Sequence, residues 1–416
     1  MQQGPPDEQI AAYEAAIATL ETTLAGNPNS ALVKQLRHEL GGDQVLELTA
    51  IALLQKKARH KLGPGIWWAT DRALQQATPW QVAKLKASWF GEQLVYDLCC
   101  GIGGDAIQLA KRPGQPQGVI AVDIDPVIIA YAAANLRHAC SETQLDCEVA
   151  ETRCQDVLQL EIPAHAAIHL DPDRRIGGKR TTRPEDYQPQ LSEVMPRIKA
   201  APAAIIKLAP AAKLDLDPDL GEHAHRCWIS LAGSVREQSL LLGDALTRAG
   251  MISGSLSAIA VNNRGSVARF DLGDYPVAKL DSLRVASVAS PGRWIVDPDA
   301  AIRAAGLTEA FAMEHGLKTL GGPPGFLTSE GDLDSETLEK VRLIATVGEV
   351  IWSGSCDERK IRRELRRRNS HAERIKVRGS GHDPAVLSKR FRECGETPIG
   401  LWIGRAGRGV FAAFSD

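Results

Sequence analysis

The pattern of apolar and polar positions divides the chain into three parts. From residue 8 to about 62, apolar side chains repeat at helical spacing, and a Gly-Asn-Pro-Asn-Ser stretch at 26–30 interrupts the repeat. From about residue 73 to 275, short apolar runs alternate with helical segments, which is typical of a parallel sheet with crossover helices. The pattern therefore predicts an N-terminal helical region (1–72), a central α/β domain (73–275) and a smaller α/β C-terminal domain (276–416).

Apolar runs also predict individual elements. Strands of the central domain are expected at 94–98, 118–123, 145–151, 165–170 and 203–208, with two more at 226–240 and 256–271. In the C-terminal domain a mostly helical segment (295–312) is followed by a loop at 321–325. The remaining elements are expected to be a strand (348–353), a basic helix (357–369), a strand (373–378), a helix (383–394) and strands at 398–404 and 409–414.

Composition narrows the class of protein. The 416 residues are 44% hydrophobic, which is enough for a large core. No run of 18 apolar residues occurs, so we expect no membrane span. The first residues lack the basic start and apolar stretch of a secretory signal. None of the eight cysteines forms a C-x-x-C pair, so we expect no metal site and reduced thiols in a cytoplasmic protein.

The net charge of −2 conceals an asymmetry along the chain. The segment 341–416 holds 16 Lys and Arg against 9 Asp and Glu, a net charge of +7, which leaves −9 for the rest. Because the positive charge gathers at one end, that basic module is expected to meet an anionic partner.

A glycine-rich turn follows the first strand of the central domain. The apolar run ends at Asp97 and continues as Leu-Cys-Cys-Gly-Ile-Gly-Gly-Asp. Glycines let the backbone approach a ligand closely, and the start of the next helix favours negative ligand groups. The next strand ends at Asp123, where a carboxylate suits a ribose diol. Together these features indicate a nucleotide site.

The details of the turn select among nucleotides. Dinucleotide folds use G-x-G-x-x-G, whereas here Asp97 precedes the glycines and Ala stands at position 106. The leading acid would repel a pyrophosphate, but it suits a ligand that carries an ammonium and a sulfonium. S-adenosylmethionine is such a ligand.

At this point the chain resembles a known family. Residues 97–110, together with 119–126, resemble the core of the class I methyltransferases, and within that class the trimethylguanosine synthase type of RNA methyltransferase. Residues 77–83 are similar to the Thr-Pro-Glu-x-Ile-Ala element that precedes the core in that group. The whole chain is still more similar to bacterial methyltransferases with a THUMP-like C-terminal domain. The resemblance implies a Rossmann-like sheet, with 226–240 and 256–271 as its antiparallel edge hairpin.

The resemblance also implies roles for residues around the cofactor. Asp97 would contact its methionine end directly or through water, and the turn glycines would let that end lie on the backbone. Asp123 would hold the ribose hydroxyls and Asp156 the adenine amino group, although Gln155 stands where the family often has Gly. Asp125, before Pro126, has a helix-capping interpretation. The predicted cofactor-binding residues are Asp97, Cys99, Gly101, Gly103, Asp123, Ile124 and Asp156.

The acceptor site is expected after the strand at 165–170. Amino-methylating enzymes often carry Asp/Asn/Ser-Pro-Pro-aromatic there, and Asp171-Pro172 matches that motif whereas Asp173-Arg174 does not. The resemblance implies Asp171 and Pro172 as catalytic residues, and Arg174, which departs from the motif, is predicted to be catalytic as well. The forked donors of Arg174 and Arg175 could bind phosphate or carboxylate in the substrate. Alternatively, Asp173 pairs with one of these arginines as a structural clamp.

Three further charged groups have two interpretations each. Lys207 in an apolar strand either contacts substrate or forms a structural ion pair. Arg236 and Glu237 either contact substrate or form an ordinary cross-strand charge pair, and the charge pair is favoured. The basic run 55–61 either completes a helix C-terminus or faces RNA beside the site.

The basic helix at 359–368 is the main indication of nucleic acid. It holds seven positive charges in ten residues, and Arg362, Arg363 and Arg366 are predicted to bind substrate phosphates. A merely solvated helix face is the alternative. Arg374, Lys376 and Arg378 alternate onto one strand face and would extend the basic surface. Aromatic residues are sparse, so backbone binding without base readout is expected.

The sequence therefore predicts an S-adenosylmethionine-dependent methyltransferase that acts on RNA, with a nucleobase nitrogen as acceptor. One alternative is a methyltransferase for a small anionic metabolite bound by Arg174 and Arg175. The other is a non-catalytic RNA-binding protein with a vestigial cofactor site. Oligomeric state is not indicated.

Overall fold

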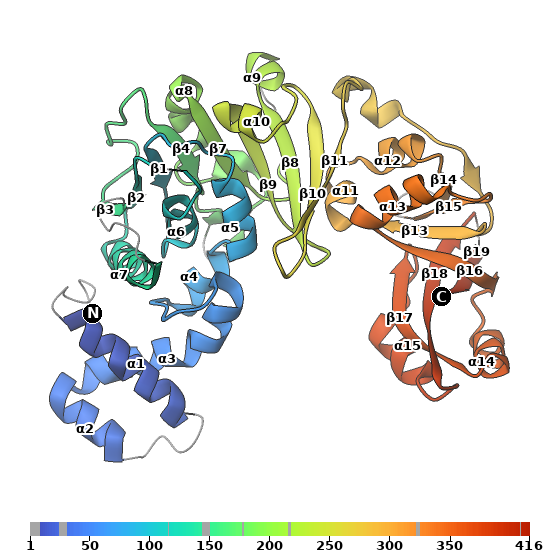
Figure 1. The fold of residues 1–416 in the computed structure, drawn as a ribbon, viewed down its shortest axis with the longest axis horizontal. Helices are drawn as coiled ribbons and strands as arrows, with labels where there is room; N and C mark the ends of the chain where they lie inside the picture. The colour runs from blue at the N-terminus through green and yellow to red at the C-terminus, as the bar shows by residue number, and fades with distance from the viewer. Residues whose placement is uncertain are drawn as a thin grey trace. The chain divides into compact units, whose positions relative to one another are not determined.

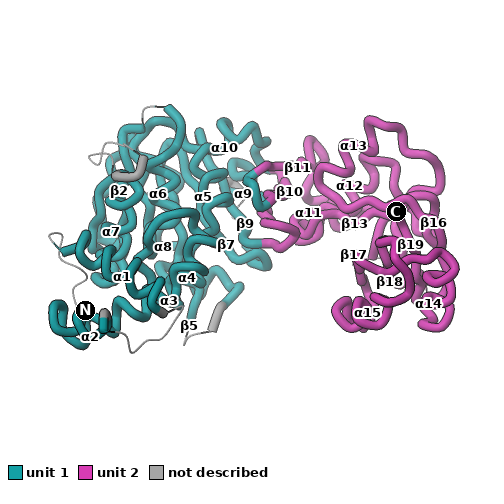
Figure 2. Tube along the Cα trace, turned by 60° about the horizontal axis from the view of Figure 1, so that its bottom comes forward, with its two compact units in different colours: residues 1–227, 236–254, 263–265 teal, residues 228–235, 255–262, 266–416 magenta. Residues whose placement is uncertain are grey.

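The computed structural model describes most of the chain and divides it into two compact units (Figures 1 and 2). Unit 1 comprises residues 1–227, 236–254 and 263–265, and unit 2 comprises 228–235, 255–262 and 266–416. The described residues are 9–24, 31–114, 116–143, 150–176, 179–214, 218–321, 325–407 and 409–416.

Unit 1 begins with the predicted helices. These are α1 (Ile10–Leu24), α2 (Ala31–Leu40) and α3 (Gly42–Leu62), while the expected break at 26–30 lies outside the described residues. Buried Ile17 and Leu20 of α1 pack where α1 meets α3. Two short helices follow, α4 (Asp71–Gln76) and α5 (Trp80–Ala87). The Thr70 hydroxyl caps α4 by accepting from the Ala73 N–H.

The sheet of unit 1 is mainly parallel, as predicted. Its strand order is β9-β7-β4-β1-β2-β3, and only β9 runs antiparallel to its neighbour. All residues of β1, β4 and β7 are buried, as expected for strands covered on both faces. The bounds are β1 Val95–Leu98, β2 Val119–Asp123, β3 Ala150–Cys154, β4 Ala167–Leu170, β7 Ala203–Leu208 and β9 Ser234–Gly243.

Chain order reverses between β1 and β4, and this reversal positions the site. From β1 the chain proceeds through α6 (Gly104–Ala110) to β2 and through α7 (Pro126–Thr143) to β3, then returns to β4 on the other side of β1. In open α/β sheets, ligands bind at the carboxyl ends of strands where the order switches. Beyond β4, α8 (Leu191–Ala200) leads to β7, and α9 (Pro218–His223) and α10 (Asp244–Arg248) complete the helices.

The two last strands predicted for the central domain are wrong in detail, because each is interrupted by a turn. The segment 226–240 forms β8 (His225–Leu231) and β9, separated by Ala232 and Gly233, which both have positive φ. Likewise 256–271 forms β10 (Leu256–Val261) and β11 (Val267–Asp271), which pair antiparallel. The apolar runs flanking each turn are nearly continuous, so periodicity alone does not mark the turns. Of the strand expected at 145–151, only residues 150 and 151 are described, and they begin β3.

Unit 2 is built on a second mixed sheet. Its strand order is β12-β14-β15-β13-β16-β19-β18-β17. The predicted basic helix and the strands around it are confirmed. The segment 295–312 is mostly helical as predicted, because α11 and α12 occupy the larger part of it, but its first residues form β13. Residues 322–324 of the expected loop lie outside the described residues. The strands are β12 Ser287–Val288, β13 Trp294–Pro298, β14 Lys318–Leu320, β15 Phe326–Ser329, β16 Ala345–Ser355, β17 Ser370–Arg378, β18 Thr397–Ala406 and β19 Gly409–Ser415, and the helices are α11 Ala300–Ala304, α12 Thr308–Glu314, α13 Ser335–Ile344, α14 Glu358–Arg367 and α15 Pro384–Phe391.

Within the described ranges, no helix combines the length and apolar character needed to cross a membrane. Nor do the side chains described there include a cluster of three or more His, Cys, Asp or Glu that could hold a metal ion.

Candidate cofactor and acceptor site

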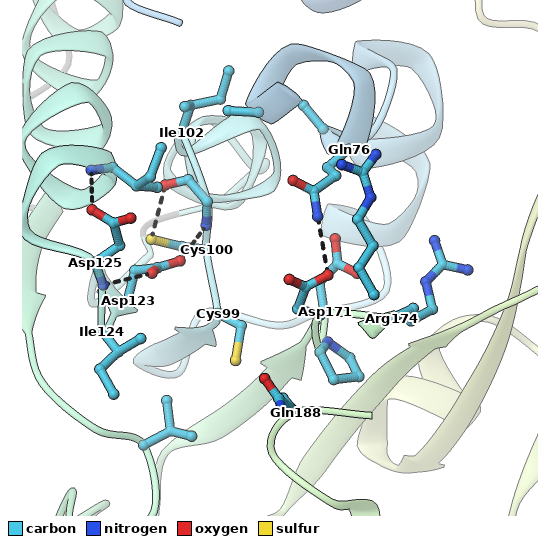
Figure 3. A pocket seen from close by; sticks show the side chains of 18 of the residues that line it. Gln76, Cys99, Cys100, Ile102, Asp123, Ile124, Asp125, Asp171, Arg174 and Gln188 are labelled. Carbon is cyan, nitrogen blue, oxygen red and sulfur yellow. Dashed lines mark hydrogen bonds between the residues drawn. The ribbon is translucent and has the colours of Figure 1, made fainter. Parts of the chain in front are cut away.

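A cavity of about 670 Å³ lies in unit 1, at the carboxyl ends of β1, β2, β3 and β4 (Figure 3). Loops after these four strands form most of its wall, and residues of α4 close another side. In Figure 3, Asp123, Ile124 and Asp125 face Asp171, Arg174 and Gln76 across Cys99. The lining residues are Thr70, Arg72, Ala73, Gln76–Thr78, Cys99–Ile102, Gly104, Asp105, Asp123–Asp125, Val127, Ile128, Asp156–Leu158, Asp171–Arg175, Gln188 and Pro189.

The turn after β1 contains three residues with positive φ. Cys99 (φ 59°) and Gly101 (φ 55°) line the cavity, and a Cβ on Gly101 would meet nothing within 4 Å. Glycine is therefore required there by the backbone angle and not by space. Gly103 (φ 82°) does not line the cavity, so its predicted cofactor contact is not matched. It precedes α6 in left-handed conformation, where a Cβ would lie 3.5 Å from Ala132.

Asp123 is fixed against this turn. Its Oδ2 accepts from the Gly101 N–H at 3.0 Å, and its Oδ1 accepts from the Asp125 N–H at 3.0 Å. Burial raises the pKa of its carboxyl, and the backbone N–H groups oppose that rise. Asp125 caps α7, because its Oδ1 accepts from the Val127 N–H at 2.9 Å and from the Ile128 N–H at 3.2 Å. The capping interpretation of Asp125 is confirmed.

One end of the cavity has an apolar wall. Ile124 is 70% exposed although it is a large apolar side chain, and it lies beside Val157 and Leu158 in the lining. Asp156 stands at the same end, where its Oδ1 accepts from the Leu158 N–H at 2.9 Å. An exposed apolar face next to a carboxylate is suited to a flat heteroaromatic ring with an amino group.

Asp97 lies beneath the cavity and does not line it. Its side chain is fully buried, and its Oδ1 is 2.6 Å from Nδ1 of His169 on β4. The direct cofactor contact predicted for Asp97 is therefore not matched in this structure. Its Oδ2 is buried and has no hydrogen-bond partner in the described parts of the chain, and burial raises the pKa of the carboxyl.

Lys86 lies at the centre of a buried ionic cluster, and no sequence pattern indicates this role. Its Nζ lies 3.1 Å from His169 Nε2, 3.0 Å from Asp105 Oδ1 and 3.1 Å from Glu237 Oε1. Burial alone would raise the pKa of Asp105, but Lys86, Lys207 and the Thr78 hydrogen bond act together against burial, with Lys86 the largest of them, and the pKa lies well below its usual range. The cross-strand charge pair favoured for Arg236 and Glu237 is not what Glu237 forms, because Glu237 is buried against Lys86 of α5, whereas Arg236 is exposed.

At the acceptor end, Asp171 is held by Lys207. Lys207 Nζ lies 2.5 Å from Asp171 Oδ2 and donates to Thr78 Oγ1 at 2.8 Å. Asp171 and Pro172 line the cavity, whereas Lys207 is buried and does not. Of the two interpretations of Lys207, the structural ion pair is the one observed, and the predicted substrate contact is not.

Asp173 is held by α4. Its Oδ1 accepts from Gln76 Nε2 at 3.1 Å, and a guanidinium nitrogen of Arg72 lies 3.4 Å from its Oδ2. The predicted clamp with Arg174 or Arg175 is therefore wrong. Both of these arginines line the cavity, and neither has an acidic partner among the described residues.

In unit 2, α14 presents its arginines on one face. Arg359, Arg362, Arg363 and Arg366 line a shallow groove together with Glu358. Glu364 lies 3.1 Å from Arg367, 2.6 Å from Arg368 and 3.8 Å from Arg363. Of the groove arginines, Arg359, Arg362 and Arg366 have no acidic partner in the described parts of the chain.

Two other predicted basic surfaces are corrected. Lys376 Nζ lies 3.1 Å from Asp297 and Arg378 lies 3.0 Å from it, so these side chains do not extend the α14 surface. In the run 55–61, Lys57 pairs with Asp71 at 2.8 Å, and Lys61 donates to two carbonyls at the end of α4. That run therefore has a structural role, which supports the helix-terminus interpretation.

The chain belongs to the S-adenosylmethionine-dependent methyltransferases. It is 32% identical over 377 residues to uncharacterized S-adenosylmethionine-dependent methyltransferases from two strains of Mycobacterium tuberculosis, a match that covers 88% of this chain and 95% of each relative. A solved Porphyromonas gingivalis W83 structure, assigned as a methyltransferase, shares the fold over 99% of both chains, with a TM-score of 0.67 and 17% identity. A Streptococcus thermophilus rRNA methylase covers 39% of the chain, but its TM-score of 0.27 is too low to bear on substrate. No family model matches the chain.

The cavity residues fit this cofactor. Gly101 leaves open space where a side chain would stand, Asp123 presents a carboxylate above the turn, and Ile124 offers an exposed apolar face. Beneath them lies the buried carboxyl group of Asp97, a group that suits a ligand carrying an ammonium and a sulfonium.

Proposed function

We propose that the protein methylates RNA at a nucleobase nitrogen, with a core of the trimethylguanosine synthase type and a THUMP-like C-terminal domain (276–416). The observation that carries the proposal is the unneutralised arginine face of α14, in a chain whose other unit contains a methyltransferase cavity. Spacings of three, four and seven residues place Arg359, Arg362, Arg363 and Arg366 on one side of the helix. Such a row suits successive phosphates of a nucleic-acid backbone.

The acceptor half of the cavity supports an amino acceptor. The bound cofactor supplies an electrophilic methyl group, so the protein mainly has to hold the acceptor in line with it. Asp171, kept in place by Lys207, accepts a hydrogen bond from the acceptor N–H and orients its lone pair towards the methyl group. Pro172 closes the wall behind Asp171.

The cavity lacks the aromatic platform that amino-methylating enzymes often have. None of the described residues that line it is aromatic, and Arg174 stands at the platform's position. A guanidinium plane can stack on a base and can also bind its phosphate. We therefore assign Arg174 to the acceptor base and Arg175 to a neighbouring phosphate.

Salt-dependent binding tests the role of α14. We expect filter binding to bulk transfer RNA to weaken steeply between 50 and 200 mM salt, on the order of 100-fold or more if several phosphates are contacted. The triple variant Arg359→Gln/Arg362→Gln/Arg366→Gln should lower the slope of log affinity against log salt by about 2 to 3. The control Lys34→Gln/Arg37→Gln/Lys56→Gln removes equal charge from exposed positions on α2 and α3. Equal slopes in the two variants would remove α14 from the proposal.

A labelling experiment tests the substrate class. The protein is incubated with labelled cofactor and with total RNA or a small-molecule extract, both from cells that lack it, and nucleosides are analysed by mass spectrometry. Label in one nucleoside supports the proposal. Arg174 and Arg175, which line the cavity without acidic partners, favour a second candidate, methyl transfer to a small anionic metabolite. Label confined to the small-molecule fraction would establish that candidate instead.

A further inference from the structure

A continuous chain of buried polar side chains runs beneath the cavity. From the end of β1 it passes from Asp97 to His169 at 2.6 Å and from His169 to Lys86 at 3.1 Å, then to Asp105 at 3.0 Å. Glu237 joins it 3.1 Å from Lys86, and Ser239 donates to the same carboxylate oxygen of Glu237 at 3.0 Å. A neighbouring branch connects Asp171, Lys207 and Thr78.

The contacts fix the protonation of the histidine. An ammonium group can only donate, so His169 Nε2 must accept from Lys86. His169 Nδ1 then carries the proton and donates it to Asp97 Oδ1. His169 is therefore neutral.

The charges in these two branches do not balance. Four carboxylates, those of Asp97, Asp105, Asp171 and Glu237, face two ammonium groups, those of Lys86 and Lys207. The buried set carries a net charge of −2 with all four ionised, and it remains at −1 if Asp97 takes up a proton. Because most of these groups are shielded from solvent, salt screens their field poorly.

Buried acceptor atoms without partners also indicate that the network lacks positive charge. Among the described residues, Asp97 Oδ2 and Glu237 Oε2 are buried with no hydrogen-bond partner, although nearly all buried polar atoms in proteins have one. Uncompensated buried charge is costly unless a cation completes the site. Asp105 and Asp171 reach the cavity wall, so a cation bound there would experience the field of the whole set.

We propose that this buried network selects the cationic cofactor over its demethylated product. Methyl transfer breaks the sulfur–carbon bond, leaves its electrons on sulfur and forms a bond to carbon from the acceptor's lone pair. The positive charge thereby leaves the sulfur for the acceptor, which restores neutrality by losing a proton. S-adenosylhomocysteine is then held less strongly than S-adenosylmethionine, and the product is released. The inference rests on the cofactor and not on the acceptor, so it survives if RNA is not the substrate.

Glu237→Gln is the informative variant. Glu237 is 1% exposed and does not line the cavity, so the amide removes one charge while leaving the cavity wall unchanged. Calorimetry should show that wild-type protein binds S-adenosylmethionine more tightly than S-adenosylhomocysteine. The variant should lower that affinity ratio by on the order of threefold to tenfold, almost wholly by weakening the charged ligand. Sinefungin, which carries an amine in place of the sulfonium, should follow the charged ligand.

Glu222→Gln is the matched control, because it makes the same change at an exposed position in unit 1. It should leave the ratio unaltered. Thermal melts establish that each variant is folded. Equal weakening of both ligands in Glu237→Gln, or an unchanged ratio, overturns the proposal. If the variant does not fold, the affinities of the wild-type protein for the two ligands still test the proposal. Product binding as tight as cofactor binding would contradict electrostatic selection.

Discussion

Lys207 Nζ lies 2.5 Å from Asp171 Oδ2, and this ion pair joins β7 to the residue that follows β4. The carboxylate lines the cavity while its counter-ion is buried behind it. The pair therefore separates two tasks, since Asp171 faces the cavity, where we propose that the acceptor binds, and Lys207 holds Asp171 from behind.

Removing the Asp171 carboxylate should abolish methyl transfer. We expect Asp171→Ala to lower the turnover rate by about 10² to 10⁴, the usual contribution of a positioned acid–base group. Cofactor affinity should fall by no more than about tenfold, the effect of losing one carboxylate of the buried network, because Asp123, Ile124 and Asp156 stand at the other end of the cavity and are retained. Turnover with labelled cofactor and calorimetry measure the two effects. Full activity in this variant would exclude Asp171 from the mechanism.

Lys207→Met should lower turnover without removing any group that lines the cavity. The variant leaves the Asp171 carboxylate without the contact that orients it. We expect turnover to fall on the order of tenfold, since Asp171 is retained. Lys207→Arg should restore part of the activity. Turnover equal to that of wild type in Lys207→Met would show that the ion pair does not orient Asp171.

Gly101→Ala should weaken cofactor binding through the backbone. Gly101 has φ 55° and open space around a built Cβ, so alanine there is strained by roughly 1 kcal/mol. Gly250→Ala is a matched control, with φ 59°, equally open surroundings and no place in the cavity. Both variants should lose similar thermal stability, and only Gly101→Ala should lose cofactor affinity. Unaltered affinity in Gly101→Ala would contradict the assignment of the turn.

Ile124→Ser should weaken cofactor binding and leave stability nearly unchanged. The side chain is 70% exposed, so folding gains little from it, but a bound ring would cover it. Losing that burial is worth about 1 kcal/mol, or roughly fivefold in affinity. Leu46→Ser, at a leucine on α3 that is 69% exposed, is the control and should bind the cofactor as wild type does. Equal affinities in the two variants would place the adenine ring elsewhere.

The parts of the site that could be predicted are local in the chain. Asp97, the turn glycines and Asp123 follow one another across adjacent strands, so spacing alone brings them together. The partners of these residues come from far away. His169 is 72 residues from Asp97 and 83 from Lys86 in the sequence. The periodicity of apolar residues does not predict contacts over such separations.

Asp173 shows the same limit. Its neighbours in sequence, Arg174 and Arg175, were the natural candidates for an ion pair, but the partner is Arg72, 101 residues away. Side chains of successive residues after a strand point in different directions, so an adjacent charge is often the wrong partner. The two interpretations of Lys207 cannot be separated from the sequence for a related reason. An apolar strand indicates that the side chain is buried, but it does not indicate which residue is its counter-ion.

The link between α7 and the segment before α4 has a practical consequence for dividing this protein. Asn135 accepts from the Trp68 N–H at 2.8 Å and donates to the carbonyls of Trp68 and Ile102 at 3.0 and 2.9 Å. These hydrogen bonds connect the segment before α4 to the turn after β1. Thr70 and Arg72 also form part of the cavity wall. A shortened protein that starts at residue 73 would begin inside α4 and lose that wall. The minimal fragment that retains a complete cofactor site therefore includes Trp68.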